Sequence, residues 1–230
     1  DIARMALEFK THTILREVPG STPGQSIFRI NNRNVSLVWE MLYLPICLRT
    51  CIAISLAMRF IYATDMHGNA QLFERVLKEA EKKEIGALVI GGDMTPFLGF
   101  DAMRIQRAFI EDYFLPRLEK FAIKAGKPVL AMMGNDDFSI NYDLLEKAED
   151  NGTLKIMHNR VISLGRFNIA GYSFIAPTPF MLKDWEKSED EIAADLRKLS
   201  SKTDMGRTVF VFHTPPANTS LDMLYNGSHA

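Results

Sequence analysis

Residues 58–93 decide the fold, and they read MRFIYATDMHGNAQLFERVLKEAEKKEIGALVIGGD. The apolar run at Arg59–Thr64 predicts a buried strand, and Ala87–Ile90 predicts a second one. Between them, Ala70–Lys83 carries apolar residues at helical spacing on one face and Glu and Lys on the other, until Gly86 ends the segment. A strand, a helix and a strand in this order predict a βαβ unit with parallel strands.

The same alternation continues to residue 212, which predicts the α/β fold class. Helices are expected at Ala102–Ala125, with a kink or restart at Pro116, at Tyr142–Asp150, and after the capping box Ser188–Glu191. Further strands are expected at Pro128–Met133, Thr153–Met157, Arg160–Leu164, Phe167–Gly171 and Arg207–Phe212.

The composition is that of an ordinary globular protein. The chain has 230 residues, 47% of them hydrophobic and 24% charged, which is enough for a core without disulfide staples. A formal net charge of -1 gives no basic field for nucleic acid or anionic lipid, so neither partner is expected. The only cysteines, Cys47 and Cys51, are expected to pack as apolar residues, which favours a reducing, cytoplasmic location.

The chain is expected to divide at Met58. Asp1–Val38 shows no sustained helical or strand period, and residues 1–57 are expected to form a leader without an assigned function. Residues 58–230 are expected to form the domain that carries the activity. Met41–Met58 is apolar, but charged residues and a proline interrupt it, and a spanning helix needs about 20 nearly uncharged residues. No membrane segment is therefore expected.

Four of the predicted strands run directly into side chains that can bind metal. These side chains are Asp65, His67, Asp93, Asn135 and His213. In open α/β sheets, ligands bind outside the carboxyl ends of parallel strands, so residues far apart in sequence can converge there. We therefore expect the five residues to form one site.

Each residue alone also has a structural explanation. Asp65 is a natural helix or turn cap, and Asp93 and Asn135 follow glycines, as turn residues often do. His67 and His213 could each be an ordinary structural histidine. A shared site explains better than coincidence why all five residues fall at strand ends.

The ligand types favour a divalent metal ion. Two carboxylates, an amide oxygen and two imidazoles form an oxygen and nitrogen set without thiolate. Such a set suits Mn, the expected ion, or Fe, Zn or Ni, better than copper(I) or an iron–sulfur cluster. Asp93 lies in the middle of the set and could bridge two ions about 3.5 to 4 Å apart, with a bridging hydroxide as the nucleophile for a phosphoryl group.

Four motifs resemble, in order, those of the calcineurin-like metallophosphoesterases: Asp65-Met66-His67, Gly91-Gly92-Asp93, Gly134-Asn135-Asp136-Asp137 and His213. The resemblance covers Met58 to the end of the chain. It implies a four-layer αββα sandwich with mixed, largely parallel sheets, and hydrolysis of a phosphomonoester or phosphodiester. It also implies two divalent ions, with Asp65 and His67 on the first, Asp93 as the bridge, and Asn135 and His213 on the second.

Two departures from the family pattern affect the expected activity. Where the family often has a histidine that assists the leaving group, this chain has Asp136. An ionised carboxylate is a poor proton donor, and family branches with Gly-Asn-x-Asp resemble small phosphodiesterases, so we predict a preference for diesters. Asp136 is expected to orient water or substrate. The family's last motif, Gly-His-x-His, is not found, and the chain is expected to be truncated before it.

These patterns together predict a hydrolase, namely a cytoplasmic metallophosphoesterase that acts on a small phosphoester, with Asn135 and Asp136 as catalytic residues. One alternative remains open, a non-catalytic metal-binding or protein-interaction module on the same fold, which the nonstandard third motif favours. Nuclease activity has precedent in the family, but no basic stripe supports it.

Overall fold

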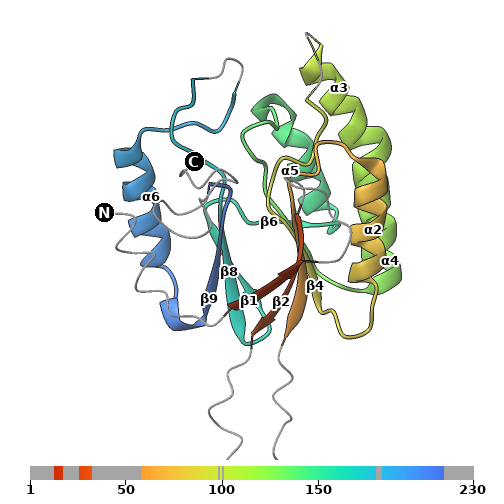
Figure 1. Cartoon of the computed structure of the whole chain (residues 1–230), viewed down its shortest axis with the longest axis horizontal. Helices are drawn as coiled ribbons and strands as arrows, with labels where there is room; N and C mark the ends of the chain where they lie inside the picture. The colour runs from red at the N-terminus through yellow and green to blue at the C-terminus, as the bar shows by residue number, and fades with distance from the viewer. Residues whose placement is uncertain are drawn as a thin grey trace, which may run out of the picture.

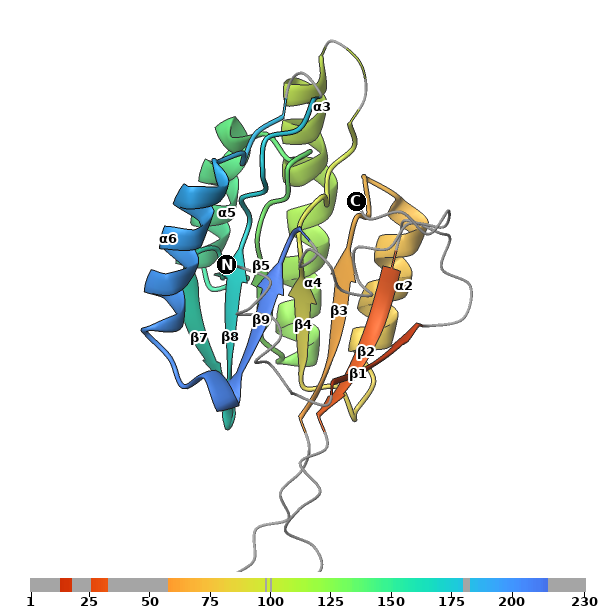
Figure 2. The ribbon, with the colours of Figure 1, turned by 60° about the vertical axis from the view of Figure 1, so that its left-hand side comes forward.

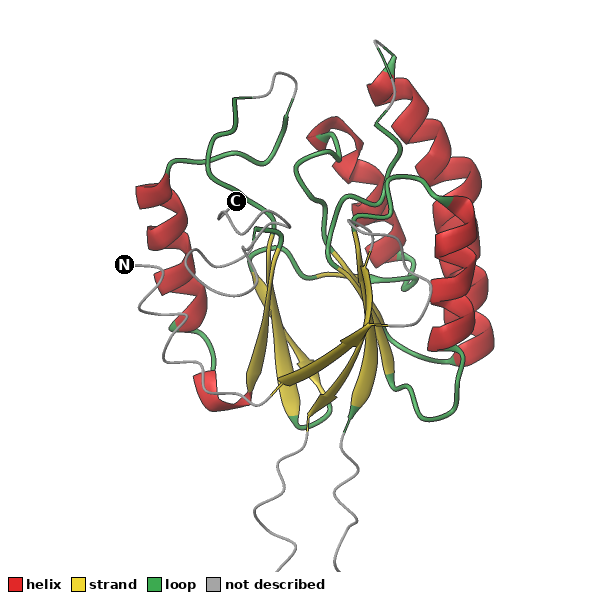
Figure 3. Ribbon diagram, viewed as in Figure 1, coloured by secondary structure: helices red, strands yellow, loops and turns green. Residues whose placement is uncertain are grey.

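Two β-sheets stand face to face, and helices cover the outer face of each sheet (Figure 1). The computed structural model describes the backbone of residues 13–17 and 26–32, and residues 58–214 apart from 98, 100 and 180–182. From one side to the other, the layers are one helix, a three-stranded sheet, a six-stranded sheet and a group of helices (Figure 3). The α/β class that the sequence pattern predicts is confirmed, and the four layers are those that the family resemblance implies.

The larger sheet holds most of the parallel strands. Its order is β1 (Thr13–Glu17), β2 (Ser26–Asn32), β3 (Arg59–Thr64), β4 (Ala87–Ile90), β5 (Val129–Ala131) and β6 (Lys155–Ile156). Strands β3 to β6 run parallel; for example, Tyr62 pairs with Val89, and Val89 pairs with Leu130. The loops that follow β3, β4 and β5 therefore meet at one edge of the sheet.

The smaller sheet has the order β7 (Arg160–Leu164), β8 (Phe167–Tyr172) and β9 (Thr208–Phe212). Strands β7 and β8 are antiparallel, whereas β8 and β9 are parallel. Figure 2 shows α6 (Glu189–Ser200) lying along this sheet. The predicted capping box is confirmed, because Ser188 and Glu191 each accept a hydrogen bond from the other's backbone.

Among the described residues, four α-helices cover the outer face of the larger sheet: α2 (Ala70–Ala80), α3 (Ala102–Phe109), α4 (Leu115–Ala125) and α5 (Tyr142–Asp150). Helix α2 begins after Asn69, whose side chain accepts a hydrogen bond from the Leu72 N–H, and ends at Ala80 rather than at Lys83. A π-helical segment, Ile110–Phe114, joins α3 to α4. Pro116 lies in the first turn of α4, directly after the π-helical segment, so the predicted restart is found there.

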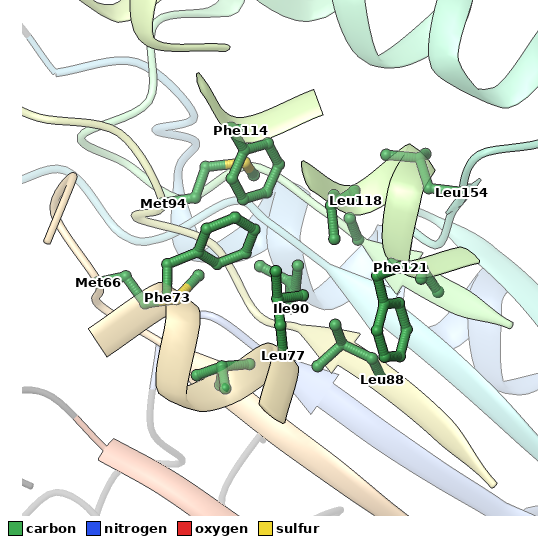
Figure 4. Packing of buried hydrophobic residues seen from close by; sticks show 14 of the residues in the cluster. Met66, Phe73, Leu77, Leu88, Ile90, Met94, Phe114, Leu118, Phe121 and Leu154 are labelled. Atoms are coloured by element: carbon green, nitrogen blue, oxygen red, sulfur yellow. The ribbon is translucent and has the colours of Figure 1, made fainter. Parts of the chain in front are cut away.

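Apolar side chains fill the three spaces between the four layers. On β4, Leu88 and Ile90 belong to the core beneath the helices, whereas Ala87 and Val89 face the other sheet. This follows from the two-residue period of a strand and explains why β4 is apolar throughout. Figure 4 shows the first of these cores, in which α2, α4 and β4 interdigitate. The third core lies between the smaller sheet and α6.

Residues 1–57 contribute more to the fold than the sequence predicts. Strand β2 pairs antiparallel with β3, from Ser26 opposite Thr64 to Asn31 opposite Arg59, and β1 pairs with β2. The expectation of no strand before Val38 is therefore wrong for these two segments. Neighbouring apolar residues such as Ile27 and Phe28 break the strict alternation by which a strand is recognised.

The predicted apolar stretch at 41–57, with its two cysteines, lies outside the described residues. Within the part of the chain that the structure describes, none of the helices has both the length and the apolar character needed to cross a bilayer.

An aromatic cluster joins the smaller sheet to the segment before α6. The ring of His158 lies 5.7 Å from that of Tyr172, 5.2 Å from that of Phe174 and 5.1 Å from that of Trp185, measured between centroids. His158 Nδ1 accepts a hydrogen bond from the Ser173 N–H at 3.0 Å, which requires that this nitrogen carry no proton. Burial lowers the pKa of His158 to about 4, and the nearby Lys187 ammonium contributes to this shift.

This buried histidine should make the fold sensitive to acid. An unfolded histidine binds its proton near pH 6.5, but folded His158 does so only near pH 4, so the free energy of unfolding falls as the pH drops between these values. We expect the free energy of unfolding of His158→Asn, which keeps a hydrogen-bond acceptor, to fall by about 1.5 kcal/mol less than that of the wild type between pH 6.5 and about pH 5. Urea unfolding at both pH values measures this, and equal losses would contradict it.

The core beneath the helices should dominate stability. On α4, Leu118 is fully buried, whereas Ile123 is 79% exposed. We expect Leu118→Ala to lower the free energy of unfolding by about 2 to 5 kcal/mol, because it removes core contacts and leaves a cavity. Ile123→Ala on the same helix should change it by no more than about 0.5 kcal/mol. Urea unfolding measures the free energy of unfolding of both variants. A similar decrease in both would show that α4 does not bury Leu118 and expose Ile123 in this way.

Candidate metal centre

The site lies where the loops after β3, β4, β5 and β9 meet, and it contains all five residues predicted at strand ends: Asp65, His67, Asp93, Asn135 and His213. Backbone hydrogen bonds join the first two loops. The Asp65 N–H donates to Gly92 O at 3.1 Å, and the His67 N–H donates to Asp93 O at 2.8 Å. The structure therefore brings these residues together at the place that the sheet topology predicts.

Two groups of possible ligand atoms share Asp93. In the first group, atoms of Asp65, Asp93 and His213 all lie within 4.8 Å of one another, and in the second, atoms of His67, Asp93 and Asp136 do. In the structure, a ligand atom of Asp65 lies near one of His213, and a ligand atom of Asp136 lies near one of His67; the sharing of one ion by Asp65 and His67, which the resemblance implies, stays a prediction. Asp93 is common to both groups, which is the position that a bridging carboxylate requires.

Three of these residues hold left-handed backbone conformations. The φ angle is 55° at Asp65, 44° at His67 and 49° at Asp93. Residues with a side chain rarely adopt such angles, and each instance costs on the order of 1 to 3 kcal/mol. Because the surrounding structure must hold this strain in place, its concentration at two adjoining strand ends is typical of a functional site.

The glycines beside these residues permit a very close approach of the loops. A Cβ atom at Gly134 would collide with the Asp93 carboxylate and the His213 ring. A Cβ atom at Gly92, where φ is 105°, would lie 2.7 Å from Gly134 N and 2.8 Å from His213 Nδ1. Only glycine can therefore occupy either position while the acidic and imidazole groups stay in contact.

His213 enters the site as a nearly buried ring with both nitrogens engaged. Its side chain is 4% exposed, Nδ1 lies 3.0 Å from Gly91 O, and Nε2 lies 2.9 Å from Asn135 Oδ1 and 3.4 Å from Asp93 Oδ1. Burial by itself lowers the pKa of His213, but the hydrogen bond and charge of Asp93, with the charge of Asp65, outweigh it and raise the pKa to about 9. A proton on Nε2 thus occupies the direction in which a metal ion would bind, and the two would compete.

Asp137 ties the loop after β4 to the loop after β5. Its buried carboxylate accepts hydrogen bonds from the N–H groups of Met94, Thr95 and Gly134 at 3.2, 2.9 and 2.9 Å, and from the Thr95 hydroxyl at 2.5 Å. Burial raises the pKa of Asp137, as does the charge of Asp93, whereas the donors from Gly134 and Thr95 lower it. The sequence marks Asp137 as the end of a motif but gives no sign that it clamps two loops.

Asp136 forms an ion pair with a lysine that no motif predicts. The ammonium of Lys183 contacts the Asp136 carboxylate, and the two side chains are only 13% and 15% exposed. The Asp136 N–H donates to Asp93 Oδ1 at 2.9 Å, so the pair is attached to the shared carboxylate of the site. Lys183 belongs to a loop between β8 and α6 with no recognisable pattern, and sequence alone offers no signal for it.

The residues present fit a divalent metal ion. Their donors are carboxylate oxygens, imidazole nitrogens and the Asn135 amide oxygen, a set suited to Mn, Fe, Zn or Ni. The carboxylates of Asp93 and Asp65 raise the pKa of His213, so negative charge is concentrated around its Nε2, as expected for a cation site. No thiolate belongs to either group.

The fold and this site define an α/β domain with a candidate metal centre at the carboxyl ends of its strands. The model of the calcineurin-like phosphoesterase family matches residues 58–227, and the chain belongs to that family. Membership supports metal-dependent hydrolysis of phosphoesters in general, in a family that typically uses two metal ions, and it supports a small phosphoester as the substrate.

Solved structures share the fold at low sequence identity. One crystal structure aligns with a TM-score of 0.54 at 17% identity, covering 73% of this chain and 74% of that chain. The crystal structure of TT1561 of Thermus thermophilus aligns with a TM-score of 0.51 at 19% identity, covering 70% of this chain and 69% of that chain. No curated protein matches the chain. At these identities the likeness concerns the fold alone.

The clamp formed by Asp137 should be essential to the site. We expect Asp137→Asn to lower the free energy of unfolding by at least about 3 kcal/mol, because an amide group turned toward these donors leaves buried N–H groups unpaired. Asp143→Asn, at an exposed ion pair with Arg107, should have a much smaller effect. Urea unfolding of both variants measures the difference, and equal effects would show that the clamp contributes little.

Proposed function

We propose that the protein is a two-metal phosphoesterase that prefers phosphodiesters to phosphomonoesters. The observation that carries this proposal is the pair of ligand groups that share Asp93 at the carboxyl ends of the strands. One ion would be held by Asp65, Asp93, Asn135 and His213, and the other by His67, Asp93 and Asp136. Manganese is the proposed ion, with Fe, Zn or Ni as alternatives that the same donors accept. Such ions supply a hydroxide nucleophile near neutral pH and offset charge on phosphoryl oxygens.

The chain's own residues orient the ligands of this centre. If His213 Nδ1 donates to Gly91 O, then Nε2 is the nitrogen left to face a metal ion, and the ring cannot turn away. The Asp136 N–H fixes one oxygen of the Asp93 carboxylate. Asn135 contributes an uncharged oxygen beside His213, which binds without adding negative charge to the site.

The charge of the site supports the preference for diesters. Asp65, Asp93 and Asp136 bring three carboxylates to the two groups. These carboxylates would cancel most of the positive charge of two divalent ions. A phosphodiester carries one negative charge, whereas a monoester carries nearly two near neutral pH, so the positive charge that remains matches the diester better. An ionised Asp136 is also unsuited to protonate the leaving oxygen, which favours esters that leave readily.

The rest of the proposal concerns the whole chain. Residues 58–230 form the domain that carries the activity, and residues 1–57 form a leader that lends β1 and β2 to the edge of its sheet. The protein acts in the cytoplasm on a small phosphoester, and nucleic acid is not its partner, since the net charge of -1 provides no attraction to a phosphate backbone.

A second candidate function is a non-catalytic metal-binding or protein-interaction module. The ion pair between Asp136 and Lys183 favours it, because a carboxylate held by an ammonium is less available as a metal ligand. Catalytic turnover separates the two candidates.

The test is the manganese-dependent hydrolysis of bis(4-nitrophenyl) phosphate and 4-nitrophenyl phosphate by the full chain. We expect a higher kcat/KM for the diester, loss of turnover with chelator, and a fall of at least about 100-fold in Asp93→Asn, since loss of even an outer partner of a metal ligand costs about 10- to 100-fold. Asp143→Asn, which replaces an exposed carboxylate outside the ligand groups, should retain full activity.

Different failures would have different meanings. A monoester preference would reject the proposed specificity alone. Bound manganese without turnover in the wild type would favour the non-catalytic module.

A further inference from the structure

Lys183 brings a positive charge to the edge of the candidate metal centre. Its ammonium contacts Asp136, whose other carboxylate oxygen lies 3.8 Å from Nδ1 of His67, and its side chain is only 13% exposed. Lysine is rarely buried to this degree unless it is paired. The Nζ atom also lies 4.8 Å from the ring centroid of Phe97, in the loop after β4.

Hydrogen bonds fasten the two residues that follow Lys183 to residues 135–139, which flank Asp136. The Asp184 N–H donates to Asn135 O at 3.3 Å, and the Asp184 carboxylate accepts a hydrogen bond from the Ser139 N–H at 2.6 Å. The Trp185 indole N–H donates to Asp137 O at 2.9 Å. These three bonds fix the backbone next to Lys183 against the loop that holds Asn135 and Asp136, so the ammonium has a defined position relative to both ligand groups.

A lysine in this position can do more than balance Asp136. An ammonium carries three N–H donors, so in general it can bind a carboxylate and a second acceptor at the same time. The ammonium also stands beside the group that contains His67 and Asp93, where the phosphoryl group of a substrate would be held. A charge-assisted hydrogen bond from a preorganised ammonium to a phosphoester oxygen is strong when little water reaches it.

We propose that Lys183 is a catalytic residue that donates a hydrogen bond to the leaving oxygen of the phosphoester, with Asp136 as the residue that positions its ammonium. This inference rests on the proposed phosphoesterase function and adds the residue that handles the leaving group. In the reaction, the oxygen of water bonds to phosphorus and the bond from phosphorus to the leaving oxygen breaks, with its electron pair remaining on that oxygen. The leaving oxygen ends as a hydroxyl with a proton from water, and Lys183 keeps its own proton throughout.

The test compares three variants with the wild type. Lys183→Gln removes the charge, and Lys183→Arg keeps it. Lys187→Gln is the matched control, because Lys187 lies on the same segment, pairs with Asp195 at 2.7 Å and lies 4.2 Å from the Phe174 ring, yet contacts neither ligand group. All proteins are loaded with manganese, and their metal content is measured first.

The first readout is the binding of inorganic phosphate by titration calorimetry, which does not depend on turnover. Phosphate presents an oxygen in every tetrahedral direction, so it reaches the ammonium as a leaving oxygen would. We expect binding to weaken about 10- to 100-fold in Lys183→Gln, as for loss of a hydrogen bond to a charged group. Binding should recover in large part in Lys183→Arg and be unchanged in Lys187→Gln. Unchanged phosphate binding in Lys183→Gln with tighter manganese binding would overturn the proposal and make Lys183 a counter-charge to the acidic residues.

The second readout is the rate of hydrolysis of aryl phosphodiesters whose leaving phenols differ in acidity. If Lys183 offsets charge on the leaving oxygen, the loss of kcat in Lys183→Gln must grow as the phenol becomes less acidic. A loss of equal size for every phenol would overturn the proposal, because a structural role would lower all rates alike. If the wild type binds phosphate through Lys183 but hydrolyses no ester, then the phosphate contact stands and both the proposed function and the leaving-group role fail.

Discussion

The buried carboxylate of Asp137 is the constraint on which the geometry of the site depends. A charge placed in the interior is costly unless hydrogen bonds replace the water it has lost, and Asp137 receives four such bonds from Met94, Thr95 and Gly134. These donors come from two loops that are about 40 residues apart in sequence, so satisfying one carboxylate fixes the separation of the two loops. Asp93 lies directly before one pair of donors and Asn135 directly after another donor, and their positions follow from this clamp.

The same rigidity lets the chain hold strained backbone where the ligands are needed. Asp65, His67 and Asp93 adopt left-handed conformations that a free loop would leave. Backbone hydrogen bonds between the loops after β3 and β4 hold them, and the buried strands β3 and β4 anchor those loops. Part of the stability of the α/β core is thus used to preorganise carboxylate and imidazole groups, which removes the cost of ordering them when a ligand binds.

Many of the strands and helices and all five candidate ligands could be predicted from the sequence, because the patterns that reveal them are local. The bounds of β3, β4, α5 and β7 follow from apolar period and turn residues, and the ligands are found because parallel strands end at one edge. The grouping of Asp65 with His213 depends on how the two sheets face each other, which no local pattern records. Lys183 lies 47 residues from Asp136, and only packing of the segment before α6 brings them together. Strands β1 and β2 escape prediction because their apolar residues do not alternate strictly.

The ion pair of Asp136 and Lys183 links the leaving group to the choice of substrate. With His213 neutral and two divalent ions in place, the carboxylates of Asp65, Asp93 and Asp136 and the ammonium of Lys183 would leave an excess of two positive charges. A hydroxide and a singly charged diester together carry two negative charges and would cancel this excess. A hydroxide and a doubly charged monoester together carry three, which is one more than the excess. Without the ammonium the excess would be one positive charge, and even the hydroxide and the diester together would outnumber it. Because uncompensated charge is costly where little water reaches the site, the lysine that would stabilise the leaving oxygen would also set the charge of the ester that the site accepts.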